Sequence, residues 1–566
     1  MDDIESILLA HLEFLYGPDA GSALETLLEL MQSVEGRLDQ GRRQLTEKDV
    51  ALITYGDMVQ AVGRSPLASL GEFLVEHVGD VINTVHMLPF YPYSSDDGFS
   101  VVNYLEVDPA LGDWRDVERM RRSFHLMFDA VLNHISASSE WFTGFLNGDE
   151  SYRDFFTVVD PATDLSAVFR PRELPLLTQA ETATGPRYVW TSFGPDQIDL
   201  NYRSPAVLLA AIEVLLTYVA HGADVIRLDA VAFLWKELGT SCIHLPQTHR
   251  IIQLLRSVLN AVAPGVIIIT ETNVPHEENV SYFGDGTNEA DLVYNFALPP
   301  LTLHAFHTGD TSVLSDWADG MRAPTATNTF FNFLASHDGI GVGGARACLS
   351  EEDIRAMADV VEEQGGNVSY RATPDGGRVP YELNINFLDA LGEHDVGGSD
   401  DLIAKRFLTS QAVMLSLQGM PAIYFHSMFG SRGWPEGVAQ TGAYRTVNRQ
   451  KVQRDQIESE LRIEGSIRNL VFDGYRSLLR ARGAHSAFAP AATQQIIRLH
   501  RSVFAVLRTS DQGSVLCLHN VSKERIAVDA SALIVGPATD IVAGESLERV
   551  VEMRPYQTLW LTVGTS

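Results

Sequence analysis

The chain has 566 residues, 45% of them hydrophobic, and a formal charge of −31 from 73 acidic and 42 basic side chains. This length exceeds the ~250–300 residues at which single cores stop growing, so we expect several domains. The negative charge would repel nucleic-acid phosphates and anionic lipids, which argues against both as partners. No apolar run reaches the ~18 residues of a membrane span. The N-terminus, MDDIESILLA, opens with acids where a secretory signal carries bases, so we expect a cytoplasmic protein.

The predicted elements begin with an N-terminal helical extension over residues 1–46, where apolar residues such as Ile4, Leu8 and Leu12 recur at helical spacing. The next segment, residues 47–490, contains eight short apolar runs separated by helix-like stretches. The runs are 50–56, 82–90, 125–134, 224–231, 266–272, 292–297, 329–338 and 422–427. Continuous β-branched and aromatic runs are typical of strands in a helix-covered parallel sheet. The pattern therefore predicts a (β/α)8 TIM barrel of the α/β class.

Two spacings between these runs are too long for a turn and a helix. They fall at about 135–220 and about 339–420, and we expect inserted loop domains there, on the C-terminal face of the barrel. From 491 to 566 short alternating strands replace the earlier pattern, which predicts a C-terminal all-β domain. Three scattered cysteines, Cys242, Cys348 and Cys517, have no metal-ligand spacing, so we expect neither a disulfide framework nor a metal site.

Polar residues gather where the predicted strands end. These residues are Asp129, Asn133, His134, Arg227, Asp229, Glu271, His337 and Asp338. One such residue alone is readily explained as an ion pair that closes the barrel. Several together favour an active site, because burying unpaired charges costs several kcal/mol each.

Glycoside cleavage would use this set of side chains. It needs one ionised carboxylate that attacks the anomeric carbon and one protonated carboxyl that releases the leaving group. Arg227 lies two residues before Asp229 on the same strand face and can keep it charged, so Asp229 fits the nucleophile. Glu271 follows an apolar run with no basic neighbour in sequence, which favours a raised pKa and the role of acid/base. Asp338 would stabilise positive charge on the sugar ring.

Four motifs carry a family resemblance, namely DAVLNH (129–134), VIRLDAV (225–231), ITET (269–272) and FLASHD (333–338). In this order they resemble the signature regions of the α-amylase family of glycoside hydrolases and transferases. Further stretches resemble its sucrose phosphorylase subfamily: LITYGD (52–57), HMLPFYPYSSDDGF (86–99), FRPRELP (169–175), KELGTSC (236–242), YNFALPPLTLHA (294–305) and SHDGIGV (336–342). The resemblance covers about residues 50–450 and implies a glycosyltransferase that acts as a retaining α-glucoside phosphorylase.

The resemblance also implies roles for single residues. Asp229 would be the nucleophile, Glu271 the acid/base and Asp338 the transition-state stabiliser. The side chains implied to hold the glucosyl ring are Asp96, His134, Phe193, Gln197, Arg227 and His337. Arg172 matches an arginine that meets phosphate, although taken alone it could equally form a surface salt bridge, and Arg445 and Arg432 are the next candidates. No Gly-rich nucleotide loop follows a strand, so we expect inorganic phosphate as co-substrate and no cofactor.

The sequence gives least information on the acceptor, the molecule to which the glucosyl group is joined. The stretch PAIYFHSMFGSRGWPEG (421–437) departs from sucrose phosphorylase and resembles glucosylglycerol and glucosylglycerate phosphorylases, which share GSR at 430–432. Arg432 could pair with a glycerate carboxylate or merely order its loop, whereas His426 would suit a neutral polyol. Because an acidic composition also accompanies salt adaptation, we expect glucosylglycerol first, glucosylglycerate second, and sucrose or its phosphate third.

Two other functions remain open at this point. A hydrolase of the same family would keep all three carboxylates and need no phosphate contact. A non-catalytic binding subunit would normally have lost carboxylates, and Asp229, Glu271 and Asp338 are all present. A homodimer is possible on this sequence.

Overall fold

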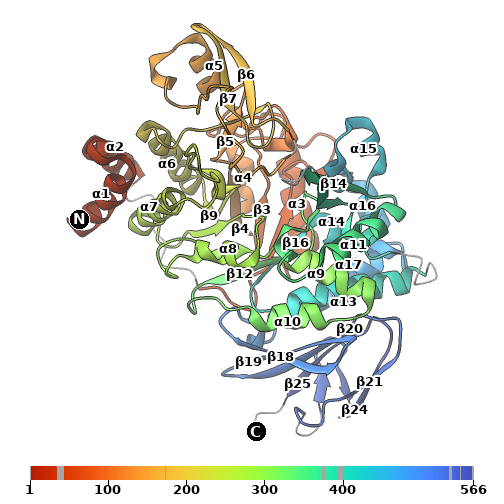
Figure 1. The fold of residues 1–566 in the computed structure, drawn as a ribbon. Coiled ribbons are helices and arrows are strands. Elements are labelled where there is room, and N and C mark those ends of the chain that lie inside the picture. The colour runs from red at the N-terminus through yellow and green to blue at the C-terminus, as the bar shows by residue number, and fades with distance from the viewer. Residues whose placement is uncertain are drawn as a thin grey trace.

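A closed barrel of eight parallel strands forms the centre of the computed structural model, which describes residues 2–34, 44–172, 174–372, 377–392, 399–534, 538–547 and 550–563 (Figure 1). The predicted (β/α)8 fold is confirmed. In chain order the barrel strands are β1 (Ala51–Thr54), β3 (Thr84–Met87), β4 (His125–Ala130), β9 (Ala223–Leu228), β10 (Ile267–Thr270), β11 (Leu292–Tyr294), β12 (Thr329–Phe333) and β16 (Met420–Tyr424). Each strand pairs with its neighbours in chain order, and β16 pairs with β1 to close the barrel.

Helices cover the outside of the barrel, so the strands are apolar on both faces, as the continuous hydrophobic runs indicated. They are α3 (Pro66–Val78), α4 (Trp114–Arg121), α6 (Pro205–Ala220), α7 (Pro246–Val262), α9 (Leu298–Thr308), α10 (Ser312–Gly320), α13 (Asp400–Ser416) and α17 (Ile467–Gly483). Proline and serine begin several of them. Ser65 caps α3 by accepting from the backbone N–H of Ala68, and Ser466 caps α17 in the same way.

All eight predicted runs extend past the carboxyl ends of their strands. The excess is largest in the run 125–134, where β4 ends at Ala130, and in the run 329–338, where β12 ends at Phe333. After β4 the chain turns out of the barrel, and β5 (His134–Ser136) pairs antiparallel with β8 (Gln197–Asp199). Asn133, His134, His337 and Asp338 therefore lie beyond the barrel strands, where their side chains can face a pocket instead of a neighbouring barrel strand.

Two long connections rise from the carboxyl ends of the strands. The first, between β4 and β9, contains β5, α5 (Glu140–Asn147), β6 (Leu177–Thr182), β7 (Gly185–Trp190) and β8. Figure 1 shows α5, β6 and β7 projecting at one end of the molecule, opposite the C-terminal strands. The second, between β12 and α13, contains β13 (Ile340–Gly341), α11 (Glu351–Glu363), β14 (Asn367–Ala372), β15 (Arg378–Asn384) and α12 (Phe387–Ala390). Both connections contribute side chains to the site described below.

The two ends of the chain pack on the barrel at different places. Helices α1 (Asp2–Tyr16) and α2 (Ala20–Val34) lie against α7 and α6 through buried leucines such as Leu8, Leu12 and Leu27 (Figure 1). The C-terminal part is all β, with a six-stranded sheet in the order β18 (Thr493–His500), β19 (Val503–Ser510), β20 (Gly513–Asn520), β25 (Thr558–Val563), β22 (Ala538–Asp540), β23 (Glu545–Leu547). A second pair of strands joins β21 (Ile526–Asp529) to β24 (Val550–Met553).

Among the described residues, no helix is long and apolar enough to span a bilayer. The predicted domain boundaries stay predictions.

Candidate active site

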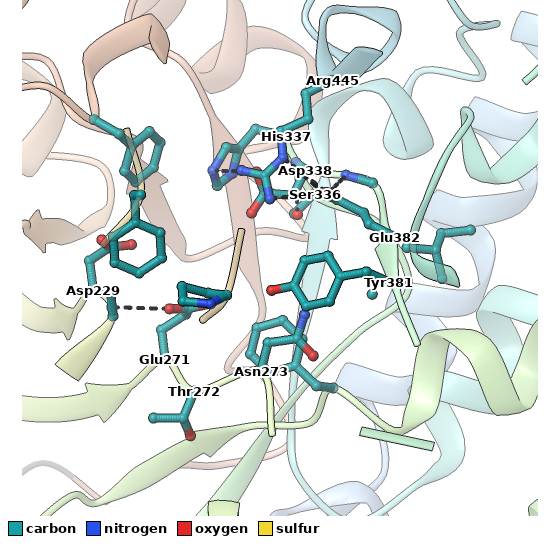
Figure 2. A pocket seen from close by; sticks show the side chains of 18 of the residues that line it. Asp229, Glu271, Thr272, Asn273, Ser336, His337, Asp338, Tyr381, Glu382 and Arg445 are labelled. Carbon is teal, nitrogen blue, oxygen red and sulfur yellow. Dashed lines mark hydrogen bonds and ion pairs between the residues drawn. The ribbon is translucent and has the colours of Figure 1, made fainter. Parts of the chain in front are cut away.

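A pocket opens at the carboxyl ends of the barrel strands and collects most of the polar residues singled out in the sequence. Figure 2 shows Asp229 and Glu271 on one side of it and His337, Asp338 and Arg445 on another. The remaining predicted residues that line this pocket are Asp96, His134, Arg172, Phe193, Gln197 and Arg227. Side chains from distant strand ends and from both long connections thus meet in one cavity.

The floor of the pocket is built around Arg227. This arginine on β9 donates to Asp129 on the adjacent strand β4, directly opposite it in register, and to Asp229 Oδ1 at 2.7 Å. His86 Nε2 lies 2.7 Å from Asp129 Oδ2 and fills the other side of that carboxylate. All four side chains are buried. A guanidinium shared between two carboxylates favours their ionised forms, so Asp229 can carry the negative charge that a nucleophile needs.

Glu271 follows β10 and has a different electrostatic environment. Its Oε2 accepts a hydrogen bond from the backbone N–H of Ala230 at 3.1 Å, while its Oε1 is 3.9 Å from Arg227, too far for a hydrogen bond. Burial and the neighbouring Asp229 charge raise the pKa of Glu271 to about 7. Burial also raises the pKa of Asp229, but Arg227 opposes this directly. Glu271 is therefore the carboxyl that holds a proton near neutral pH.

The backbone beside these carboxylates is strained. Ala230 has φ +48° and ψ +30°, in the left-handed region that a residue with a Cβ rarely adopts. Asp96, which lines the pocket, and its neighbour Asp97 also have positive φ values of +52° and +48°. Strain of this kind costs about 1–3 kcal/mol per residue and collects at functional sites. At Ala230 it accompanies the N–H contact to Glu271.

Asp338 is held ionised. Burial raises its pKa, but Arg445, His337 and Arg449 outweigh this and bring the pKa below the usual range. Arg445 contacts its Oδ1 at 2.5 Å. His337 stacks on Phe99 with ring centroids 4.7 Å apart, and burial lowers the pKa of His337 to about 3, so the imidazole is neutral. A charged Asp338 beside a neutral donor ring suits a group that stabilises positive charge on a substrate.

The predicted sugar-binding residues His134, Gln197 and Asp96 lie within hydrogen-bond distance of one another or of the Phe99 carbonyl oxygen. His134 Nε2 lies 2.9 Å from the Phe99 carbonyl oxygen, and Gln197 Nε2 donates to the same oxygen at 3.3 Å. Gln197 Nε2 is also 3.5 Å from Asp96 Oδ2. The ring of Phe193 lies 5.3 Å from that of His134. A sugar ring could contact an aromatic face here while its hydroxyls bond to carboxylate, amide and imidazole.

A buried lysine fixes the first long connection to the barrel. Lys236 Nζ is 2.8 Å from Asp199 Oδ2 on β8 and donates to Asn133 Oδ1 at 2.9 Å, just beyond β4. Asp199 is fully buried and also accepts from the backbone N–H and the hydroxyl of Ser192. Since Phe193 and Gln197 lie on the same segment, this network positions both of them over the pocket.

Comparison with known proteins agrees with this geometry. Residues 78–344 match the family described as "Alpha amylase, catalytic domain". The glucosylglycerate phosphorylase of Spirochaeta thermophila is 49% identical to the chain, over 97% of the length of each. The chain belongs to the α-amylase family, in its branch of glucoside phosphorylases. It is accordingly a glycosyl-transferring enzyme.

Two other glucoside phosphorylases have lower sequence identity to this chain. The glucosylglycerol phosphorylase of Marinobacter adhaerens is 27% identical, over 78% of this chain and 89% of that protein. The crystal structure of sucrose 6F-phosphate phosphorylase from Thermoanaerobacter thermosaccharolyticum superimposes on this chain with a TM-score of 0.75. The two sequences are 24% identical, and the superposition covers 91% of this chain and all of that one, so the likeness supports the fold. Identity to the glucosylglycerate phosphorylase is much higher than identity to the glucosylglycerol phosphorylase, so the comparisons favour the acceptor that was expected second over the one expected first.

Two residues predicted to contact the acceptor do not line the pocket. Arg432 turns to Asp389, with NH1 2.8 Å from its Oδ1, and lies beside a separate surface cavity. His426 is buried in the short helix α14 (Phe425–Met428) at 2% exposure, with aromatic neighbours Tyr424 and Phe425. The ion pair and the packing explain these placements, and neither side chain reaches the carboxylates.

Three further residues of the site were not found from the sequence. Arg449 contacts Asp96, Asp97 and Asp338 at 3.1, 2.7 and 3.6 Å. Tyr381 and Glu382 enter the pocket from β15 (Figure 2). Arg449 lies four residues after Arg445, a helical spacing that could have suggested a shared face. For the two β15 residues no local sequence signal exists, because their neighbours in space come from other segments.

Proposed function

We propose that this protein is a retaining glucosylglycerate phosphorylase, which converts glucosylglycerate and inorganic phosphate into α-glucose 1-phosphate and glycerate. The observation that supports this most is the 49% identity to a glucosylglycerate phosphorylase over nearly the whole of both chains. The pocket supports the reaction class independently, because its two carboxyl groups have different surroundings: Asp229 accepts a hydrogen bond from Arg227, whereas Glu271 lies 3.9 Å from that guanidinium and has a pKa raised to about 7. Glucosylglycerol is the second candidate substrate.

The first half-reaction breaks the bond between the glucosyl carbon and the glycerate oxygen. Asp229 attacks the anomeric carbon with a carboxylate oxygen, and Glu271 gives its proton to the departing oxygen, so that glycerate leaves with a free hydroxyl. Asp338 stabilises the positive charge that develops on the ring. A glucosyl ester of Asp229 and an ionised Glu271 remain.

The second half-reaction reverses these steps with phosphate. Glu271 accepts the proton of the incoming hydrogen phosphate, whose oxygen attacks the anomeric carbon and displaces the Asp229 carboxylate. Two inversions return the α configuration. The proposed chemistry needs only these side chains and inorganic phosphate, and Arg172 is the proposed phosphate contact, because its guanidinium borders the pocket.

The test is an acceptor and donor panel with the purified full chain. Glucosylglycerate, glucosylglycerol and sucrose are each incubated with and without phosphate, and glucose 1-phosphate and free glucose are measured. We expect phosphate-dependent glucose 1-phosphate release to be fastest with glucosylglycerate, and the α anomer in early NMR spectra. Release of free glucose irrespective of phosphate would identify a hydrolase instead. A preference for glucosylglycerol would restore the second candidate.

A further inference from the structure

Unusual backbone conformations are concentrated in the loop that carries the proposed nucleophile. This loop runs from Asp229, directly after β9, to Leu245, directly before α7. Of the six non-glycine residues with positive φ in the described part of the chain, three lie in this loop, namely Ala230 at +48°, Cys242 at +53° and His244 at +57°. Such conformations cost free energy and persist only where surrounding contacts hold them. The loop must therefore be fixed by contacts near both of its ends.

At its beginning the loop is joined to Glu271, the proposed acid/base. The backbone N–H of Glu271 donates to the carbonyl oxygen of Leu228, the last residue of β9, at 3.1 Å. The backbone N–H of Ala230 donates to Glu271 Oε2, also at 3.1 Å. Ala230 is buried, so little water competes for this N–H. Glu271 is therefore fixed to the end of β9 through both its backbone and its side chain.

At its end the loop is joined to the segment that follows Glu271 on the chain. His244 Nδ1 lies 2.7 Å from the Tyr282 hydroxyl, and His244 Nε2 lies 3.1 Å from Glu278 Oε2. Glu278 belongs to α8 (His276–Val280) and Tyr282 to the short 3-10 helix after it, both between β10 and β11. The loops after β9 and β10 are thus bonded to each other at two separated places.

The contact with Ala230 makes the two oxygens of the Glu271 carboxyl unequal. A neutral carboxyl group has one carbonyl oxygen, which accepts hydrogen bonds, and one hydroxyl, which donates. Oε2 accepts from the N–H of Ala230, so Oε1 carries the proton of the neutral form. When Glu271 gives this proton away, the carboxylate becomes charged and the same N–H binds Oε2 more strongly. One backbone group thus holds the side chain in both of its protonation states.

Resting on the proposed function, we propose that the backbone N–H of Ala230 is the positioning group of the acid/base. It fixes Oε2 of Glu271, so that Oε1 gives its proton to the departing glycerate oxygen in the first half-reaction and accepts the proton of phosphate in the second. The contacts of His244 with Tyr282 and Glu278 keep the strained loop in the conformation that presents this N–H.

The direct test removes only the N–H. Lactic acid is incorporated in place of Ala230, which converts the amide to an ester and leaves the side chain unchanged. We expect the alkaline limb of kcat/KM for glucosylglycerate to move up from about 7 by about one pH unit, because the lost bond stabilises the ionised form of Glu271 more than the neutral form. The same replacement at Ala232, two residues further along the loop, is the matched control and should leave the limb at about 7.

Two donors separate positioning of the acid/base from general damage to the site. Release of glycerate from glucosylglycerate in a single turnover needs the proton of Glu271, whereas release of fluoride from α-glucosyl fluoride needs no proton. The Ala230 ester should slow glycerate release roughly 10-fold or more and fluoride release by less than about twofold. Equal losses with both donors, or a limb that stays at about 7, would show that this N–H has only a structural role and would overturn the inference.

A second pair of variants tests the far end of the loop without altering the backbone. Tyr282→Phe removes the hydroxyl beside His244 Nδ1, and we expect the same limb to move up, by less than in the ester, with the same split between the two donors. Tyr475→Phe is its matched control, because Tyr475 is also buried and its hydroxyl donates to Gln411 Oε1 at 2.7 Å on α17, outside the pocket. Identical pH profiles for these two variants would show that the His244 contact does not act on Glu271.

Failure of the proposed function has a different outcome. If wild type releases glucose 1-phosphate from another glucoside and not from glucosylglycerate, the proposed substrate is wrong. The limb and the split between donors, measured with that glucoside and α-glucosyl fluoride, then still decide whether the N–H of Ala230 positions the acid/base.

Discussion

The floor and the rim of the pocket both consist of arginines and carboxylates, but they differ in origin and burial. The floor residues Asp129, Arg227 and Asp229 come from the ends of adjacent barrel strands, and the Arg227 side chain is 4% exposed. The rim residues Arg172, Glu382 and Arg445 come from three separate segments, and Arg172 and Arg445 are 26% and 21% exposed. Barrel strands place groups with the precision of a hydrogen-bonded ladder, whereas the long connections hold theirs through side-chain contacts.

This difference in origin and burial suits the floor and the rim to two different functions, bond breaking and ligand recognition. The floor has its charges paired before substrate arrives, which suits bond breaking that must be the same for every glucoside of the family. In the rim, the ion-pair contact of Arg172 with Glu382 leaves donors of its guanidinium for the proposed contact with phosphate. The connections can therefore change acceptor preference without disturbing the carboxylates on the barrel.

The strongest test of the floor is Asp229→Asn, which keeps the volume and removes the attacking oxyanion. We expect the rate of glucose 1-phosphate formation to fall at least about a thousandfold while the circular dichroism spectrum is unchanged. The control is the same assay with α-glucosyl fluoride, which also needs the nucleophile and should be lost too. A folded variant with more residual activity would assign the nucleophile to another residue.

Glu271→Gln distinguishes acid catalysis from simple charge placement. We expect a loss of about 10²–10⁴-fold with glucosylglycerate and a smaller loss with α-glucosyl fluoride, whose leaving group needs no proton. Because the pKa of Glu271 is raised to about 7 and its protonated form is the acid, kcat/KM for glucosylglycerate should decline as pH rises through about 7. A pH profile that is flat from 6 to 8, or equal losses with both donors, would contradict this assignment.

Lys236→Met tests how the first connection is joined to the barrel. The substitution keeps the aliphatic stem and leaves Asp199 buried without its cation, so we expect the free energy of unfolding to fall by about 3–5 kcal/mol. Denaturant midpoints measure it. Lys405→Met is the matched control, because Lys405 pairs with Asp401 at 2.6 Å on the surface and should matter by no more than about 1 kcal/mol. Similar midpoint shifts in both variants would mean that the buried bridge has no special role.

The smallest effect is expected for Arg432→Ala. Its partly exposed pair with Asp389 should contribute about 0.2–1 kcal/mol to stability, and the KM for glycerate should change by less than about twofold, since Arg432 lies outside the pocket. Transfer from α-glucosyl fluoride to glycerate measures it beside Arg172→Ala. A larger rise in the KM for glycerate with Arg432→Ala than with Arg172→Ala would show that Arg432 contacts the carboxylate and that this prediction is wrong.

The barrel and its carboxylates could be predicted from the sequence because they depend on local patterns. Continuous apolar runs mark buried parallel strands, and a polar residue directly after such a run must lie at the carboxyl end of the barrel. The sequence therefore predicts that Asp229 and Glu271 lie at the same end of the barrel. Arg227 could be assigned to Asp229 because residues two apart on a strand share a face.

The rim depended on the tertiary structure. Glu382 lies 210 positions after Arg172 and 63 before Arg445. The family resemblance named both arginines as candidate phosphate contacts, but nothing in their own segments showed that Glu382 would join them. Arg432 shows the converse, because a local motif suggested an acceptor contact and the folded chain directs the side chain to Asp389 instead. Strand periodicity is a property of neighbouring residues, whereas the meeting of charges from separate loops is decided only when the whole chain is packed.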